Sequence, residues 1–450
     1  MDDTRTNDFV ALYSILEEVE QGIGTGDGES LDAAEARLSA AQRTFEESTG
    51  VSESKINHFS VVVATLWGHL KRAREQFREA DDAYLFAHQL LMNSSGADSV
   101  RDRREAGLWT YRGLSQVSIN STDMLASAVQ CFETAISIRS REEDPGFETR
   151  WSLAAAWMNR GDALGRLPGR TNLEEVIVSN EKAEKLLDGF SLESNTAFRT
   201  RLAMTLLNRG EAYVRLSTQY GGEYAEDALA SFGRAVDMLR EGVKQGNEES
   251  RRMLAVALTN LCRSRLVLFQ TGSQESSAEA REALQIVTAT SELNADLILM
   301  DLTCRVVLCR SLENPADVKG TTSEMTDLVE EGLARAMSLV VDGVVPPALC
   351  GLVSELFRCG ADVYRRYLPR FLAEYLLDHL DPERGESVFS NCALCHEVAV
   401  ESLWTAIAII QEKGFSGMGS SEFDREADLQ TDWNKCRERL AEIRSTRFTL

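Results

Sequence analysis

Apolar residues recur along most of the chain at intervals of three and four, the spacing of residues on one face of an α-helix. Leu31, Ala34, Leu38 and Ala41 show the pattern early in the chain. Segments of this kind are separated by short stretches rich in Gly, Pro, Asn and Ser, which interrupt helices. The pattern therefore predicts a chain built from helices.

Residues 153–187 contain a clear pair of such helices. Gly161 falls within the first helix, a Pro-Gly break follows at 168–169, and Val176 and Ala183 share a face of the second helix. A short polar break between two amphipathic helices predicts an antiparallel helical hairpin.

Similar hairpins come before and after this one. Three of them carry a small, an aromatic and a small residue at intervals of four and three, which places all three on one helix face. Close helix approach is expected there, with the ring filling the space between the small residues. The triplets are Ala80, Tyr84 and Ala87; Ala128, Phe132 and Ala135; and Ala228, Phe232 and Ala235.

These hairpins resemble tetratricopeptide repeats, in which an Asn-Arg-Gly-type first helix precedes a second helix with the small-aromatic-small triplet. The best matches are LLNRGEAY at 206–213, followed by 228–235, and WMNRGDAL at 157–164, followed by Val176 and Ala183. The resemblance implies an all-α fold: a right-handed α-solenoid of antiparallel helical hairpins with a helical C-terminal cap.

The repeats are longer than those of the family, whose period is about 34 residues. Gly68, Gly113, Gly161 and Gly210 lie 45, 48 and 49 residues apart, so repeats of about 45–50 residues are expected. Two later hairpins, at 260–287 and 302–336, are degenerate. Cys262 and Cys304 stand in them where glycine is expected.

The breaks predict three parts. Residues 1–50 form an N-terminal helix pair suited to cap the solenoid, with a glycine run at 22–28 ending its first helix. Residues 51–342 form the solenoid, and residues 343–450 form a C-terminal helical region of degenerate repeats or a cap. Pro346-Pro347 marks the second boundary, because neither proline suits a helix interior. A separate docking module is the alternative for the last part, and we favour continuation and capping.

Charge narrows the partner class. The chain has 71 acidic and 48 basic residues, a net charge of -23, which disfavours direct binding to nucleic acid and to anionic membranes. We expect a protein or peptide partner of basic or mixed charge.

The N-terminal sequence MDDTRTNDFV lacks the basic start and apolar core of a secretory signal. The apolar stretch 398–410 is shorter than the roughly 20 residues that span a bilayer. Nine irregularly spaced cysteines are typical of a reducing compartment. A cytoplasmic location without membrane insertion is expected.

One motif points to a cofactor. Cys392, Cys395 and His396 form CxxCH, the attachment pattern of c-type haem, and with His379 they supply ligand types that zinc accepts. The motif falls within a predicted continuous helix at 388–411, however. Buried thiols on an apolar helix face, beside Leu394, are the explanation that we favour. We therefore expect no cofactor.

Catalytic signatures are missing from the sequence. There is no GxSxG elbow, no phosphate-binding GxxxxGK[ST] loop and no HExxH, and only five histidines occur. The sequence predicts a protein that is not an enzyme.

If the units stack as in the family, first helices line the concave surface, and polar residues on them are candidates to grip an extended peptide. Arginines five residues beyond the glycine are candidates to bind a carboxylate. The alternative is that the amides stabilise helix contacts and the arginines lie in solvent. The candidate groove residues are Tyr111, Asn159, Asn208 and Asn260, with Arg166 and Arg215.

Arg112, Arg160 and Arg209 each immediately precede the repeat glycine. We expect an architectural role for them, with the aliphatic stems packed against the adjacent helix.

The sequence as a whole predicts a non-catalytic interaction scaffold, adaptor or regulatory subunit that binds a protein or peptide through the concave surface. A first alternative is a sensing solenoid that binds a small molecule or signalling peptide and switches a partner enzyme. A second is a metal or haem protein that uses the CxxCH motif.

Overall fold

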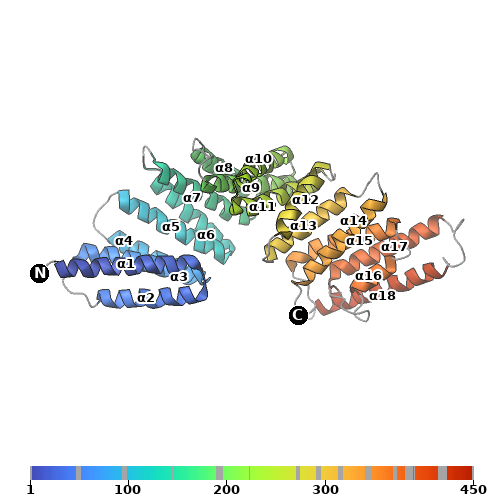
Figure 1. Cartoon of the computed structure of the whole chain (residues 1–450), viewed down its shortest axis with the longest axis horizontal. Coiled ribbons are helices and arrows are strands. Elements are labelled where there is room, and N and C mark those ends of the chain that lie inside the picture. Colours follow the sequence, from blue (N-terminus) through green and yellow to red (C-terminus); the bar gives the residue numbers. More distant parts are fainter. Residues whose placement is uncertain are drawn as a thin grey trace. The chain divides into compact units, whose positions relative to one another are not determined.

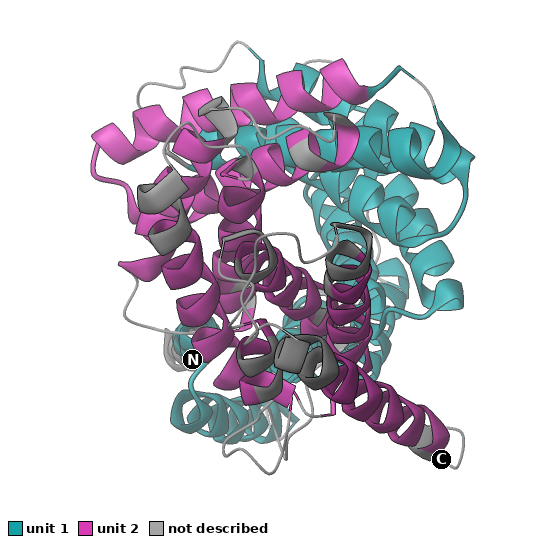
Figure 2. Cartoon of the chain, turned by 90° about the vertical axis from the view of Figure 1, so that its right-hand side faces the viewer, with its two compact units in different colours: residues 1–224 teal, residues 225–450 magenta. Residues whose placement is uncertain are grey.

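The computed structural model describes residues 3–46, 52–93, 99–142, 145–188, 196–221, 223–269, 274–289, 295–312, 318–339, 347–367, 372–380, 389, 391–413 and 423–447. Every regular element in these ranges is an α-helix, and the helices follow one another in chain order (Figure 1). The chain divides into two units, Met1–Tyr224 and Ala225–Leu450, which are coloured separately in Figure 2.

The first unit consists of helix pairs joined by short connections. Its helices are α1 (Asp3–Thr25), α2 (Gly28–Glu46), α3 (Glu53–Ala73), α4 (Phe77–Asn93), α5 (Ser99–Ile119), α6 (Thr122–Arg139), α7 (Phe147–Arg166), α8 (Arg170–Leu187) and α9 (Thr196–Tyr220).

The second unit contains the degenerate hairpins and the C-terminal region. Its helices are α10 (Ala225–Lys244), α11 (Glu248–Phe269), α12 (Gln274–Thr288), α13 (Ala295–Ser311), α14 (Val318–Met337), α15 (Pro347–Tyr367), α16 (Leu372–Leu380), α17 (Ala393–Lys413) and α18 (Phe423–Arg447).

Neighbouring helices pack in sequence, as the repeat pattern predicts. The pairs α3–α4, α5–α6 and α7–α8 form hairpins in the first unit, and α11–α12 and α13–α14 form hairpins in the second. The prediction of an all-helical solenoid of hairpins is confirmed.

The repeat glycines let an aromatic ring of the second helix lie against the backbone of the first. A Cβ atom at Gly113 would be 2.7 Å from the Phe132 ring, and Gly68 contacts Tyr84 in the same way. Phe132 and Tyr84 are fully buried. The small-aromatic-small triplet is therefore the contact that closes each of these hairpins.

The N-terminal pair shares a core with the next helix. Leu16 and Val19 of α1, Leu31 and Leu38 of α2, and Phe59 of α3 belong to one buried cluster. Helix α1 ends at Thr25, within the glycine run at 22–28 where its end is predicted. The chain turns directly after this helix at Gly26, which has a φ of 72°.

An apolar cluster of the second unit runs from Cys262 in α11 to Cys436 in α18. The C-terminal helices thus continue the packing of the last hairpins, and Pro347 begins α15, a position where proline is favoured. The predicted part boundaries near residues 50 and 342 lie outside the described residues, so the three-part division stays a prediction. Among the described helices, none is long and apolar enough to cross a bilayer.

Candidate functional site

The predicted groove residues lie on first helices of the hairpins. Tyr111 is on α5, Asn159 on α7 and Asn208 on α9, and all three side chains are partly exposed. Asn260 lies on α11 in the second unit and is also partly exposed. The groove assignment as a whole stays a prediction.

A cavity of about 470 Å³ lies between α3 and α5, and we call it the α3–α5 cavity. Leu66 and Tyr111 line it from equivalent repeat positions, each two residues before the glycine of its helix. The face that carries the predicted ladder is therefore hollowed at this point. The other lining residues are Glu20, Val61, Val62, Thr65, His69, Val100, Arg103, Arg104, Gly107, Leu108 and Arg139.

One wall of the α3–α5 cavity is aromatic. Tyr111 stacks on Tyr84, with ring centroids 5.4 Å apart, and meets His69 edge-on at 4.5 Å. The Tyr84 hydroxyl and His69 Nδ1 are 2.8 Å apart. Burial, together with the charge of Arg72, lowers the pKa of His69 to about 4, so His69 is neutral at pH 7.

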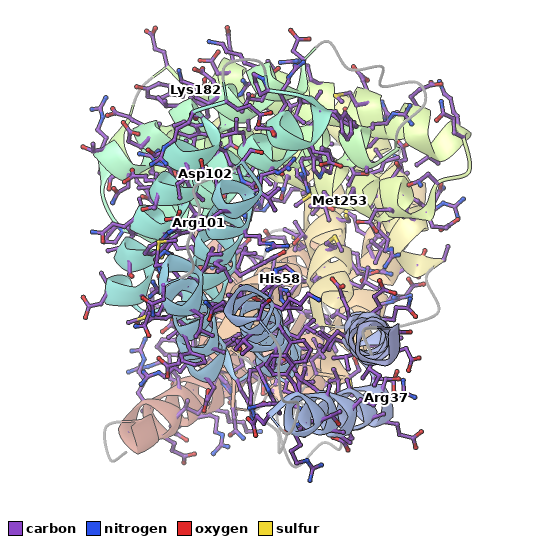
Figure 3. The ribbon with its side chains drawn as sticks, turned by 90° about the vertical axis from the view of Figure 1, so that its left-hand side faces the viewer. Arg37, His58, Arg101, Asp102, Lys182 and Met253 are labelled. Carbon is purple, nitrogen blue, oxygen red and sulfur yellow. The ribbon has the colours of Figure 1, made fainter. Side chains whose placement is uncertain are left out.

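Another part of the cavity is basic. Arg103 and Arg104 come from the first turns of α5, and Arg139 is the last residue of α6. Figure 3 shows the neighbouring Arg101 and Asp102, also at the start of α5. Sequence reasoning missed this cluster: the run RDRREA at 101–106 was a visible signal, but Arg139 joins it only through the α5–α6 hairpin.

A second cavity, of about 340 Å³, adjoins the first and shares Arg103 and Arg139 with it. Asp102, Arg141 and Glu142 also line this second cavity. The shared arginines thus stand between two hollows on the same unit.

The two arginines predicted to bind a carboxylate both have partners within the chain. Arg166 forms an ion pair with Asp162, one turn earlier in α7, at 3.1 Å. Arg215 of α9 donates from Nη1 to the backbone carbonyl of Gly165 in α7. Their geometry shows a helix-to-helix contact at Arg215 and a local pair at Arg166.

The arginines that precede the repeat glycines pair with carboxylates on the preceding second helix. Arg112 Nε is 2.9 Å from Asp81, Arg160 Nε is 3.0 Å from Glu133, and Arg209 Nη1 is 2.6 Å from Glu184. All three guanidinium groups are largely buried, with side-chain exposures of 12–13%. They link consecutive hairpins through charge-assisted hydrogen bonds.

An apolar cavity of about 600 Å³ lies on the opposite face of α3, between α2, α3 and α4. Phe45, Phe59 and Trp67 line it, and Phe86 is 55% exposed at its edge. It holds one acidic residue, Glu46, and no basic residue among those that line it.

The CxxCH motif lies at a helix start, which corrects the predicted continuous helix at 388–411. Helix α17 begins at Ala393, and the N–H of His396 donates to the carbonyl of Cys392 in the first turn. The Cys392 thiolate accepts a hydrogen bond from the Cys395 thiol. This hydrogen bond, with smaller contributions from backbone N–H groups, lowers the pKa of Cys392 to about 6.

Cys392, Cys395 and His396 are all buried, whereas Leu394 is 42% exposed and not part of the buried face. Within the described ranges, no group of three or more His, Cys, Asp or Glu side chains is arranged to hold a metal ion. The metal alternative has no support from the geometry of these ranges. The nine cysteines are free thiols.

No protein-family model matches the sequence, and no curated protein matches it. Solved structures do match. The apo form of RapI is similar with a TM-score of 0.56 at 10% identity, over 96% of this chain and 99% of RapI. The chain has a tetratricopeptide-like fold. RapI is itself a TPR-like helical repeat protein, so the likeness shows that the two chains share this fold.

Two further solved structures have lower scores, which add nothing to the fold assignment. The apo form of the quorum sensor NprR from B. thuringiensis has a TM-score of 0.45 at 11% identity, over 95% of this chain and 99% of NprR. A Rap protein complexed with Competence and Sporulation Factor has a TM-score of 0.41 at 12% identity, over 96% of this chain and 99% of that protein.

Proposed function

We propose that this chain is a non-catalytic adaptor or regulatory subunit that binds a protein or peptide through the first-helix face of its TPR-like first unit. The α3–α5 cavity carries the proposal, because it hollows that face at the equivalent positions Leu66 and Tyr111. Its mixture of aromatic, aliphatic and charged lining is typical of a recognition site.

The physical basis is a largely preformed surface. Tyr111 is held by its contacts with Tyr84 and His69, so binding costs little ordering of this side chain. Asn159 and Asn208 extend the same helix face and offer both donors and acceptors to a peptide backbone. Several modest contacts of this kind supply affinity and sequence preference together.

A substitution that fills the cavity tests the proposal without removing a packing contact. A Cβ atom at Gly107 would meet nothing closer than the Tyr111 ring at 3.9 Å, so a longer side chain there extends into the α3–α5 cavity. We expect Gly107→Leu to abolish enrichment of peptides from a random displayed library, whereas Gly107→Ala retains it.

The polar ladder has its own test in the same library selection. Asn159→Ala combined with Asn208→Ala should lower the affinity for the selected peptides by about tenfold, the effect of losing one or two hydrogen bonds. Gln130→Ala, an exposed amide on the second helix α6, is the matched control and should have no effect. Selection of the same peptides by wild type and Gly107→Leu would contradict the proposal.

A sensing solenoid is the second candidate, favoured by the size of the α3–α5 cavity. Its volume of about 470 Å³ falls within the roughly 300–1,000 Å³ range of small-ligand pockets. In that case, a selected peptide should change the small-angle scattering profile of the chain. An unchanged scattering profile would exclude the sensing function and remain consistent with the adaptor function.

A further inference from the structure

We propose that Arg103, Arg104 and Arg139 form an anion site that binds a carboxylate or phosphate group of a peptide whose apolar side chains occupy the α3–α5 cavity. This inference rests on the proposed function and adds the chemistry of the ligand. The local charge is opposite to that of the chain as a whole, whose net charge is -23.

The three arginines lack the carboxylate partner that the arginines before the repeat glycines have. Arg112, Arg160 and Arg209 each lie within 3.0 Å of an acidic oxygen. In the part of the chain that the structure describes, no ion pair within 4.0 Å involves Arg103, Arg104 or Arg139. Their positive charge is left for an external anion.

Arg139 is the most constrained of the three. Its Nε atom is buried without a hydrogen-bond partner among the described residues, and an unsatisfied buried donor is destabilising. Burial lowers the pKa of Arg139; the Tyr111 hydroxyl opposes this effect, and the charge of Arg103 adds to it. An oxyanion between Arg103 and Arg139 would relieve both the desolvation and the repulsion.

Arg104 is held in place by a neutral partner. Its Nη1 donates to Nδ1 of His58, on α3, at 2.7 Å. Because arginine only donates, His58 accepts and is uncharged; burial and then the charge of Arg104 lower the pKa of His58. The contact orients Arg104 without neutralising it.

Three acidic residues line the two cavities and do not cancel the cluster. Glu20 on α1 is an exposed residue of the α3–α5 cavity, and Asp102 and Glu142 line the adjoining one. Glu142 accepts a hydrogen bond from Thr149 at 2.7 Å. None of them forms an ion pair with the three arginines within the described ranges.

The walls favour a peptide over a free ion. Val61, Val62, Leu66 and Leu108 line the α3–α5 cavity beside Tyr111, and this apolar area gains nothing from an inorganic anion. A ligand that binds both the arginine cluster and the apolar wall carries an oxyanion next to apolar side chains. A peptide with an acidic residue, a phosphorylated residue or a terminal carboxylate among apolar neighbours has this composition.

The experiment uses the full chain and the peptides that it selects from a random displayed library. Selected peptides are synthesised with the acidic residue intact, with its amide counterpart, and with phosphoserine in its place. Binding is measured by isothermal titration. We expect the amide form to bind at least about tenfold more weakly, the loss of one charge-assisted contact. The tighter of the acidic and phosphoserine forms identifies the source of the anion.

Variants then locate the anion contact. Arg103→Gln and Arg139→Gln should remove the preference for the anionic form, whereas Arg78→Gln, on the exposed start of α4, should retain it. Arg139→Gln should unfold at or above the wild-type temperature, because it removes an uncompensated charge. Unfolding at a clearly lower temperature would show that Arg139 has a stabilising partner and would overturn the inference.

The two proposals fail in distinguishable ways. The first outcome is that Gly107→Leu no longer binds the selected peptides, but the chain shows no preference for their anionic form. This outcome would overturn the anion site and leave the proposed function standing. The second outcome is that Gly107→Leu abolishes the binding of no selected peptide. This outcome would overturn the proposed function itself.

Discussion

Gly113 sets the distance between α5 and α6, and its role is specific to its position. The Phe132 ring is fully buried and would be 2.7 Å from a Cβ atom at Gly113, so a methyl group there must displace the ring or the helix. At Gly107, six residues earlier in α5, a Cβ atom would meet nothing closer than the Tyr111 ring at 3.9 Å, an ordinary van der Waals contact. The two glycines make a matched pair in one helix.

We predict that Gly113→Ala lowers the free energy of unfolding by about 1–3 kcal/mol through overpacking. Gly107→Ala should instead raise it by up to about 1 kcal/mol, because alanine has the higher helix propensity. Urea unfolding monitored by circular dichroism measures both. Equal effects of the two substitutions would show that the Phe132 contact is not tight.

His69 makes the stability of the first unit depend on pH. Its pKa is about 4 in the folded chain and about 6.5 when exposed, so between these values the unfolded chain binds a proton that the folded chain does not. The stabilisation is complete above pH 6.5 and is lost as the pH falls toward 4.

We predict that His69→Gln reduces this dependence by up to about 3 kcal/mol between pH 7 and pH 4, since glutamine does not titrate. Urea unfolding of wild type and variant at several pH values in this range provides the comparison. Identical pH dependence in both proteins would mean that His69 titrates normally in the folded chain.

The repeat residues could be recognised from sequence because their contacts are local. Gly113 and Phe132 belong to one hairpin, and their spacing alone indicates which faces meet. Arg103 and Arg139 are different: the antiparallel hairpin places the start of α5 beside the end of α6, but the absence of a carboxylate partner is visible only in three dimensions. The start of α17 was likewise hidden, because Cys392 is not a residue that signals a helix start.

At the scale of helices, a charge network centred on one buried ion pair joins α13 to α14. Asp301 and Arg305 of α13 are 0% and 2% exposed, and Arg305 Nε donates to Asp301 at 2.8 Å. Arg305 also reaches Glu331 on α14, at 2.8 Å, and Arg335 of α14 is 3.7 Å from Asp301. The network fixes α13 against α14.

We predict that Asp301→Ala destabilises the chain by about 3–5 kcal/mol, because it leaves Arg305 buried without its principal counter-charge. Glu331→Ala is the control: its side chain is 67% exposed, and a cost below about 1 kcal/mol is expected. Thermal unfolding measures the two changes. A small effect of Asp301→Ala would mean that Glu331 alone compensates Arg305.

At the scale of the whole chain, the periodic pattern was sufficient to predict an all-helical hairpin repeat, and the likeness to RapI confirms that fold. The division into Met1–Tyr224 and Ala225–Leu450 was not visible in the sequence, since the repeat motif at 206–235 continues across it without a break. Repeat patterns report contacts between neighbours, whereas a division into units depends on all contacts together.

The central claim is that the first-helix face of the first unit binds a peptide at the α3–α5 cavity. Hydrogen–deuterium exchange of the full chain, with and without a library-selected peptide, tests it most directly. The account predicts increased protection in α3, α5 and the end of α6, and no such change in Gly107→Leu. Protection confined to other helices, with α3 and α5 unchanged, would contradict it.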